Sequence, residues 1–202
     1  MAARLDSPPK KHRPKVGELL LITVVFVAVV IWIGGAYSNH DLLWFYGQFE
    51  ERPSYIRIYH YGTTVDLRPG QPEFDTLVAA VNAAVPQHAG YYEGLRPAGD
   101  ILDYYQTKGY AIELVYDQPV QVHTRYFFPA AERLMIAIDG SYNYTQQILL
   151  FRGGSEQWLP SGIALENIDQ VRAVSEAVVV KSHPLPARII DLVSDNTMRR
   201  SG

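Results

Sequence analysis

An uncharged, strongly apolar run near the N-terminus constrains this chain more than any other feature. Residues 19–37 read LLLITVVFVAVVIWIGGAY and carry no charged side chain. Nineteen helical residues extend roughly 28 Å, which matches the hydrocarbon core of a bilayer. Twelve of the fifteen residues 19–33 are Leu, Ile, Val or Phe, and they contribute roughly −4 to −7 kcal/mol to insertion. The run predicts one transmembrane helix that inserts without help from a partner.

The charges that flank this run predict its orientation. Five of the 18 Lys and Arg residues fall within residues 1–18, against only Asp6 and Glu18, so this tail has a net charge of +3. Basic residues close to a span stay on the cytoplasmic side. We therefore expect a cytoplasmic tail over residues 1–18, a transmembrane helix over residues 19–37, and everything after it outside the cell membrane.

A cleaved signal peptide is the alternative to a retained anchor. Gly34, Gly35 and Ala36 provide the small residues that a signal peptidase requires, so cleavage after Ala36 is compatible with the sequence. The length of the apolar region favours retention, because it would be at the long end for a signal peptide. The aromatic residues that follow suit the outer membrane interface. The size of the mature protein on an immunoblot distinguishes the two.

Composition excludes several classes of function. The residues beyond the tail include 13 basic and 19 acidic side chains, a net charge of −6, and they lack the basic stripe that nucleic acid requires. Cysteine is absent, which excludes disulfides, thiolate nucleophiles and Cys-ligated zinc. A disulfide-free domain outside the cytoplasm hints at a bacterial or archaeal envelope. We expect no nucleic-acid partner and no cofactor.

A juxtamembrane stalk over residues 38–53 precedes an expected domain at residues 54–180. Alternating or β-branched patterns predict strands at residues 55–61, 63–67, 110–116, 120–125, 133–138 and 146–151. Helical spacing predicts helices at residues 72–85 and 165–178, and a short helix begins at Asp100 and stops before Gly109. This order lacks the strand-helix alternation of a parallel sheet. It predicts an α+β fold, with an antiparallel sheet and helices packed on one face.

Residues 181–202 have the prolines and polar composition of a flexible C-terminal extension. Within them, residues 187–195 place three apolar side chains on one helical side, which could fold against a partner or pack back on the domain.

The first candidate site is an aromatic and basic sheet face. Alternation sends Ile56 and Ile58 into the core and turns the intervening side chains outward, and a later strand adds a His and an Arg. Tyrosine and arginine are enriched in binding hot spots, although tyrosines paired across strands also stabilise an ordinary sheet face. The predicted partner-binding residues are Tyr55, Arg57, Tyr59, Tyr61, His123 and Arg125.

The second candidate site is a tyrosine-rich loop and helix. Tyr91, Tyr92, Tyr104 and Tyr105 lie within 15 residues of one another, and they suggest the border of a small-ligand pocket. The alternative is that these tyrosines cap one edge of the core and keep their hydroxyls in water.

Catalytic and metal-binding patterns are absent from the sequence. The histidines are scattered singly, without HxH, HxxE or HExxH spacing, and Ser155 lacks the glycine that follows a nucleophile in an elbow. We expect a non-enzymatic, membrane-anchored interaction domain that serves as an accessory or regulatory subunit of a membrane or envelope complex. Its expected partners are the lipid bilayer and another membrane or envelope protein; a membrane-tethered ligand sensor or carrier is the alternative.

Overall fold

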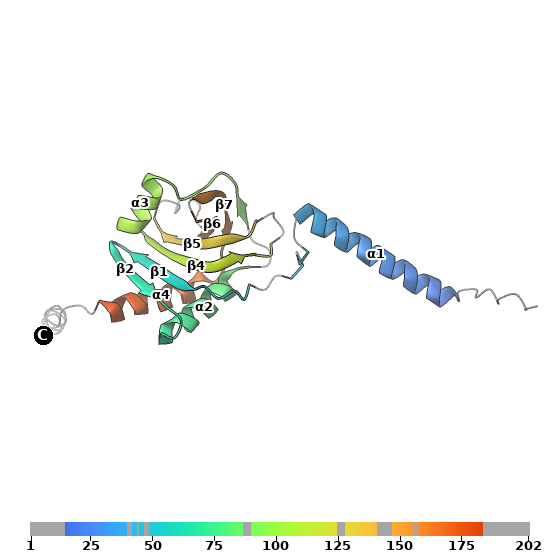
Figure 1. Cartoon of the computed structure of the whole chain (residues 1–202), viewed down its shortest axis with the longest axis horizontal. Helices are drawn as coiled ribbons and strands as arrows, with labels where there is room; N and C mark the ends of the chain where they lie inside the picture. The colour runs from blue at the N-terminus through green and yellow to red at the C-terminus, as the bar shows by residue number, and fades with distance from the viewer. Residues whose placement is uncertain are drawn as a thin grey trace, which may run out of the picture.

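The computed structural model describes residues 15–39, 42–43, 45–46, 49–86, 90–124, 128–140, 147–155 and 157–183 (Figure 1). Within these ranges the chain forms four helices and seven strands. The helices are α1 (Val16–Asn39), α2 (Pro72–Ala84), α3 (Asp100–Thr107) and α4 (Ile168–Ser182), and the strands are β1 (Tyr55–His60), β2 (Thr63–Leu67), β3 (Tyr91–Tyr92), β4 (Tyr110–Val120), β5 (Ala131–Asp139), β6 (Leu149–Gly153) and β7 (Trp158–Ala164).

The strands form one sheet in the order β2-β1-β4-β5-β6-β7-β3. Every neighbouring pair is antiparallel, which confirms the predicted α+β class and antiparallel sheet. The pairing aligns one row of apolar residues across six strands: Val65, Ile58, Ile112, Ile136, Leu150 and Ile163. Because alternate residues of a strand share a face, this register places all six side chains on one side of the sheet.

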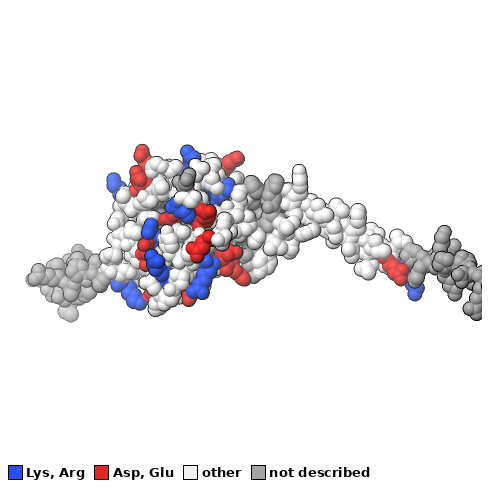
Figure 2. All heavy atoms as spheres, viewed as in Figure 1, with Lys and Arg blue, Asp and Glu red and all other residues white. Residues whose placement is uncertain are grey.

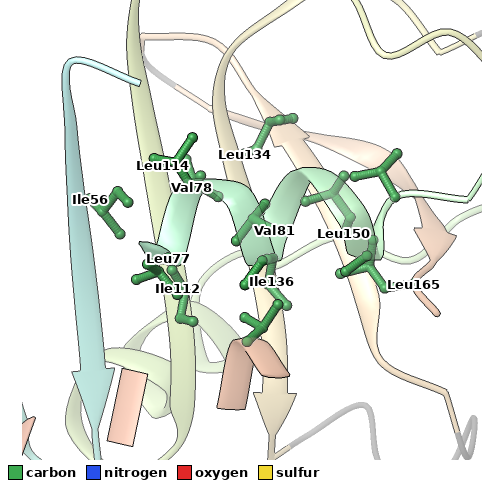
Figure 3. Close-up of a cluster of buried hydrophobic side chains, with 14 of the residues drawn as sticks. Ile56, Leu77, Val78, Val81, Ile112, Leu114, Leu134, Ile136, Leu150 and Leu165 are labelled. Carbon is green, nitrogen blue, oxygen red and sulfur yellow. The ribbon is translucent and has the colours of Figure 1, made fainter. Parts of the chain in front are cut away.

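Helices α2 and α4 cover that side and complete the larger core. Figure 3 shows Leu77, Val78 and Val81 of α2 against the labelled residues of the strands, which the helix crosses in this view. Leu77 and Val81 are fully buried, as is Val171 of α4. Burying each such side chain stabilises the fold by roughly 1.5–3 kcal/mol relative to leaving it in water. The helical stripe predicted at residues 72–85 therefore packs on the sheet, in a helix that ends at Ala84.

Helix α3 corrects the prediction that all helices pack on one face. It lies on the side of the sheet opposite α2 and α4 (Figure 1), where Tyr105 joins Met135, Phe151 and Trp158 in a second core. Strands β5 to β7 present apolar side chains on both faces, so the second face also requires cover. The short apolar stripe of α3 indicates that the helix packs, but it does not reveal which face it covers.

The strand assignments also differ in part from the sequence prediction. Strand β4 continues to Val120, and residues 121–124 leave the sheet, so the separate strand predicted at 120–125 is wrong over those described positions. Strand β7 was not predicted, because Pro160, Ser161 and Gly162 resemble a turn. On one side β7 pairs with β6, while on the other it meets only the two residues of β3. Proline is tolerated in a strand with such an open edge.

Helix α1 stands apart from the domain and buries almost none of its surface. The apolar stretch of this helix has a mean hydropathy of 2.8, and only 6% of the stretch is buried. Figure 2 shows it as a rod without charged residues except at its beginning, where Lys15 and Glu18 lie. By length and composition α1 is able to cross a membrane, and a signal sequence would share these properties.

Candidate functional site

Four charged side chains alternate in sign across the face of the sheet opposite α2. We call Asp66, Arg57, Glu113 and Arg133 the charged strip; they come from β2, β1, β4 and β5, in that order. Arg57 stands directly opposite both Asp66 and Glu113 in the strand pairing. Its guanidinium donates from Nε to Asp66 Oδ1 at 2.7 Å and from Nη2 to Oδ2 at 3.0 Å. Two parallel bonds of this kind fix the geometry of a planar guanidinium.

Glu113 is the most buried member of the strip, with 3% of its surface exposed. A carboxylate at such a depth is stable only with charged or hydrogen-bonding partners. Tyr59 donates its hydroxyl to Glu113 Oε2 at 2.8 Å, and Arg133 donates from Nε to Oε1 at 2.7 Å. The Arg133 guanidinium also lies 4.8 Å from the centre of the Trp158 ring. The strip therefore neutralises its own charges and joins the second core.

The predicted partner-binding residues fall into different environments. Tyr55 and Arg57 are half-buried on the strip face, and the Arg57 guanidinium lies 5.6 Å from the Tyr55 ring centre. Tyr59 is 6% exposed, so it is part of the core and not of the surface. Burial, followed by the charge of Glu113 and the hydrogen bond to it, raises the pKa of Tyr59 to about 12. Asp66 instead has its pKa lowered by the hydrogen bond from Arg57.

Tyr61 and His123 lie at opposite ends of the domain. Tyr61 occupies the turn after β1, at the end farther from α1. His123 follows β4 at the other end, where its ring makes an edge contact with Tyr46 at 6.4 Å between ring centres. Arg125 lies outside the described residues. The structure therefore brings together Tyr55, Arg57 and Tyr59, but not Tyr61 and His123.

Two tyrosines are exposed at the end of the domain away from α1, and we call Tyr61 and Tyr104 the distal tyrosines. Their exposed fractions are 53% and 37%. Tyr61 donates to Asp139 Oδ2 at 2.6 Å, a hydrogen bond that raises the pKa of Tyr61 to about 12. A Cβ atom on Gly140, the next residue, would lie 2.7 Å from Tyr104 Cε1. The two rings thus lie beside the same end of β5.

Tyr61 also has an unusual backbone conformation. Its φ is +48°, in the left-handed region that a bulky side chain rarely adopts. The Tyr61 ring contacts the rings of His60 and Tyr110, whose centres lie 4.7 Å and 6.0 Å from its own centre. Strained conformations of this kind occur often where a side chain must be presented at a functional surface.

The four tyrosines of the predicted ligand pocket differ in their burial and in the core that each one packs against. Tyr92 donates its hydroxyl to Gln147 Oε1 at 2.7 Å, while Tyr91 packs against the larger core. Tyr105 is 1% exposed within the second core. Tyr104 is exposed at the distal end, and its ring meets the Tyr105 ring edge-on, with 5.9 Å between ring centres. Tyr92, Tyr104 and Tyr105 therefore lie on or beside the second core, while Tyr91 lies on the larger core. A ligand pocket bordered by these tyrosines stays a prediction.

Two surface hollows are lined by described residues of the domain, and Gln147, which accepts the hydrogen bond from Tyr92, lines the first of them. The first has a volume of about 290 Å³ and the second about 390 Å³. The first is lined by Gly90, Gln147, Ile148, Ala164, Leu165, Glu166 and Ile168. The second, which we call the Tyr116 hollow, is lined by Glu51, Arg52, Pro53, Ser54, Pro69, Tyr116, Asp117, Gln118 and Val120.

Tyr116 is the residue of interest in the second hollow. It is 5% exposed, and its hydroxyl is buried without a hydrogen-bond partner among the described residues. Burial raises its pKa. Alternation along β4 correctly places Tyr116 on the core face, but no sequence signal distinguishes a paired tyrosine hydroxyl from an unpaired one. Among the described residues, no group of three or more His, Asp or Glu side chains is arranged to hold a metal ion.

Comparison with protein-family models, with curated proteins and with solved structures finds no match to this chain. Any assignment of function therefore begins from the geometry of α1, the charged strip, the distal tyrosines and the Tyr116 hollow.

Proposed function

We propose that this protein is a membrane-anchored, non-catalytic interaction domain, an accessory or regulatory subunit of a membrane or envelope complex. One observation carries the proposal: α1 is apolar around its whole circumference and is not covered by the domain. Leu20 and Phe26, for example, have exposed fractions of 64% and 66%. A helix that is apolar on all sides requires a lipid or protein environment, because water would solvate so much apolar surface at a high cost.

The charges beside α1 support the orientation of this anchor. The basic excess over residues 1–18 favours a cytoplasmic N-terminus, and the domain then lies outside the cell membrane. The anchor keeps the domain at the surface, where its contacts are restricted to molecules of the same membrane or of the adjacent envelope.

The distal tyrosines support a protein partner. The charged strip is a poor docking surface, since its four charges are already satisfied within the sheet. Tyr61 and Tyr104 instead present aromatic rings to solvent at the end of the domain away from α1. Exposed tyrosine contributes large contact area with little loss of side-chain entropy, which explains its enrichment in hot spots.

A photo-crosslinking amino acid at position 61 or 104 tests this surface in intact cells. The proposal predicts a discrete crosslinked membrane or envelope protein from both positions, and none from the exposed control position Glu176 on α4. Tyr61→Ser combined with Tyr104→Ser should abolish co-isolation of that protein, with the melting temperature of the domain monitored as a control for folding. Equal crosslinking from all three positions, or from none, would contradict the proposal.

The Tyr116 hollow supports a second candidate function, a membrane-tethered sensor or carrier of a small ligand. Its volume of about 390 Å³ lies within the range of small-molecule sites. Glu51 and Asp117 on its lining favour a cationic ligand that also accepts a hydrogen bond from Tyr116.

Tyr116→Phe separates this candidate from a purely structural role. The change removes only the unpaired hydroxyl, so the domain should be as stable as the wild type or more so. Titration with ethanolamine and longer amino alcohols, whose hydroxyl can accept the bond from Tyr116, should show binding to Tyr116→Phe that is about tenfold weaker than to the wild type, the equivalent of one hydrogen bond. Tyr59→Phe on the opposite face is the matched control and should leave this binding unchanged. Equal affinity in wild type and Tyr116→Phe would exclude Tyr116 from a ligand site.

A further inference from the structure

The chain folds back beside α1 after the helix ends. The indole Nε1 of Trp32 donates a hydrogen bond to the carbonyl oxygen of Leu42 at 3.1 Å. Trp32 precedes Asn39, the last residue of α1, by seven positions, which corresponds to roughly 10 Å along the helix axis. Side chains of a helix tilt toward its N-terminus, so the indole does not extend far toward the helix end. Leu42 therefore lies beside the last turns of α1 and not beyond them.

The folded-back segment exposes apolar side chains. The exposed fractions are 65% for Leu42, 47% for Leu43, 52% for Phe45 and 44% for Tyr46. We call these four residues the membrane collar. Ile31, the neighbour of the Trp32 that bonds the Leu42 carbonyl, is likewise apolar and is 62% exposed. Apolar side chains of both the collar and the helix are thus exposed where the chain leaves α1.

The collar is also close to the folded domain. Tyr46 contacts the ring of His123, and Phe49, three residues further along, is 4% exposed within the larger core. Three residues extend at most about 11 Å. The chain therefore passes from the collar into the core without a long linker, and the position of the collar determines how far the domain can lie from the helix end.

We propose that the membrane collar inserts into the boundary between lipid headgroups and acyl chains of the bilayer that α1 crosses. The domain is then held against the membrane surface and does not move on a free tether. This inference rests on the proposed membrane anchor and identifies the lipid surface as a second partner. Leucine, phenylalanine and tyrosine side chains suit this layer, because their apolar atoms leave water while the tyrosine hydroxyl stays hydrated.

Site-directed spin labelling tests the proposal on the full chain in phosphatidylcholine vesicles. The sequence contains no cysteine, so Phe45→Cys creates a unique labelling site. Val27→Cys within α1 and Lys108→Cys at the distal end provide the lipid and water references. We expect the label at position 45 to collide more often with oxygen than with a water-soluble nickel chelate, as at position 27 and in contrast to position 108.

The outcomes separate the collar from the anchor. If position 45 has the water-like accessibility of position 108 while position 27 lies in lipid, the collar proposal is wrong and the anchor stands. If position 27 is also accessible to the nickel chelate, both proposals fail.

A second measurement follows the height of the domain above the membrane. A donor fluorophore on Gln118→Cys, near the end of β4 that faces α1, transfers energy to acceptor-labelled lipids. Leu43→Ser combined with Phe45→Ser should lower the transfer efficiency, because a polar collar releases the domain from the surface. The exposed Val180→Ser on α4 is the matched control and should leave the efficiency unchanged. Equal efficiency in all three proteins would overturn the proposal.

Discussion

At the scale of single residues, the charged strip shows how neighbouring strands satisfy charges that would otherwise destabilise a sheet. Arg57 donates two hydrogen bonds to Asp66 and stands opposite Glu113 in the strand pairing, and Glu113 accepts from Tyr59 and Arg133. The alternation of sign matters because like charges directly opposite each other on paired strands repel. The strip therefore stabilises the sheet. From its residue types alone, it would be taken for a binding surface.

The pair formed by Arg57 and Asp66 predicts a specific loss of stability in acid. The folded state lowers the pKa of Asp66 through its hydrogen bond from Arg57, so the pair stabilises the fold above the unfolded pKa of about 3.9. This contribution disappears as the pH falls through the lower folded pKa. Because the pair is partly exposed, we expect only about 0.2–1 kcal/mol.

Denaturant unfolding of wild type and Asp66→Asn in detergent, from pH 6 to pH 2, measures this contribution. Asp66→Asn should be less stable than the wild type at pH 6, and the two should converge toward pH 2. Parallel curves with a constant difference would mean that the ion pair does not account for the effect.

At the scale of elements, the sequence predicts those strands and helices whose side-chain pattern is simple. Alternation in β1 and β4 correctly places Ile58 and Ile112 in the larger core, and helical spacing correctly predicts the packed stripe of α2. Strand β7 is different, because glycines lie opposite aromatic residues. Gly153 pairs with Trp158, and Gly162 pairs with Phe151. Each glycine leaves space for a ring on the neighbouring strand, yet in the sequence alone glycine indicates a turn.

Gly153→Ala tests this account of the β6 and β7 pair. A Cβ atom at Gly153 would lie 2.9 Å from Trp158 Cε3, so the ring must shift within the second core. Overpacking of this kind costs about 1–3 kcal/mol. The adjacent Gly154→Ala is the matched control, since a Cβ there meets no atom within 4 Å. Chemical denaturation should show the loss in Gly153→Ala alone, and equal stability of the two variants would refute the packing explanation.

The candidate surface was harder to predict than the fold, because its exposure depends on α3. The sequence places Tyr59 on the outward face of β1, and the strand alternation is correct. However, α3 and its flanking loop extend the second core over part of that face, and Tyr59 is buried beside Glu113. Contacts between segments some 50 residues apart decide this outcome, and local patterns do not encode them. Tyr61 remains exposed because it occupies a turn at the end of the sheet.

At the scale of the whole molecule, the chain divides into an apolar rod and a mixed-charge domain. Acidic and basic residues are interspersed over the domain surface in Figure 2, whereas α1 is uncharged beyond Glu18. This division is the basis of the proposed anchor, since the domain satisfies its own core without α1. The function as an interaction domain depends on which side of the membrane the domain occupies.

Cysteine labelling in intact cells tests this central claim most directly. The chain has no cysteine, so Lys10→Cys in the tail and Lys108→Cys on the domain each give one site for a membrane-impermeant maleimide. The account predicts that position 108 is labelled in intact cells, and that position 10 is labelled only after permeabilisation, both on the full-length chain. Labelling of position 10 but not 108 in intact cells, or labelling of 108 on a chain shortened by cleavage near Ala36, would contradict it.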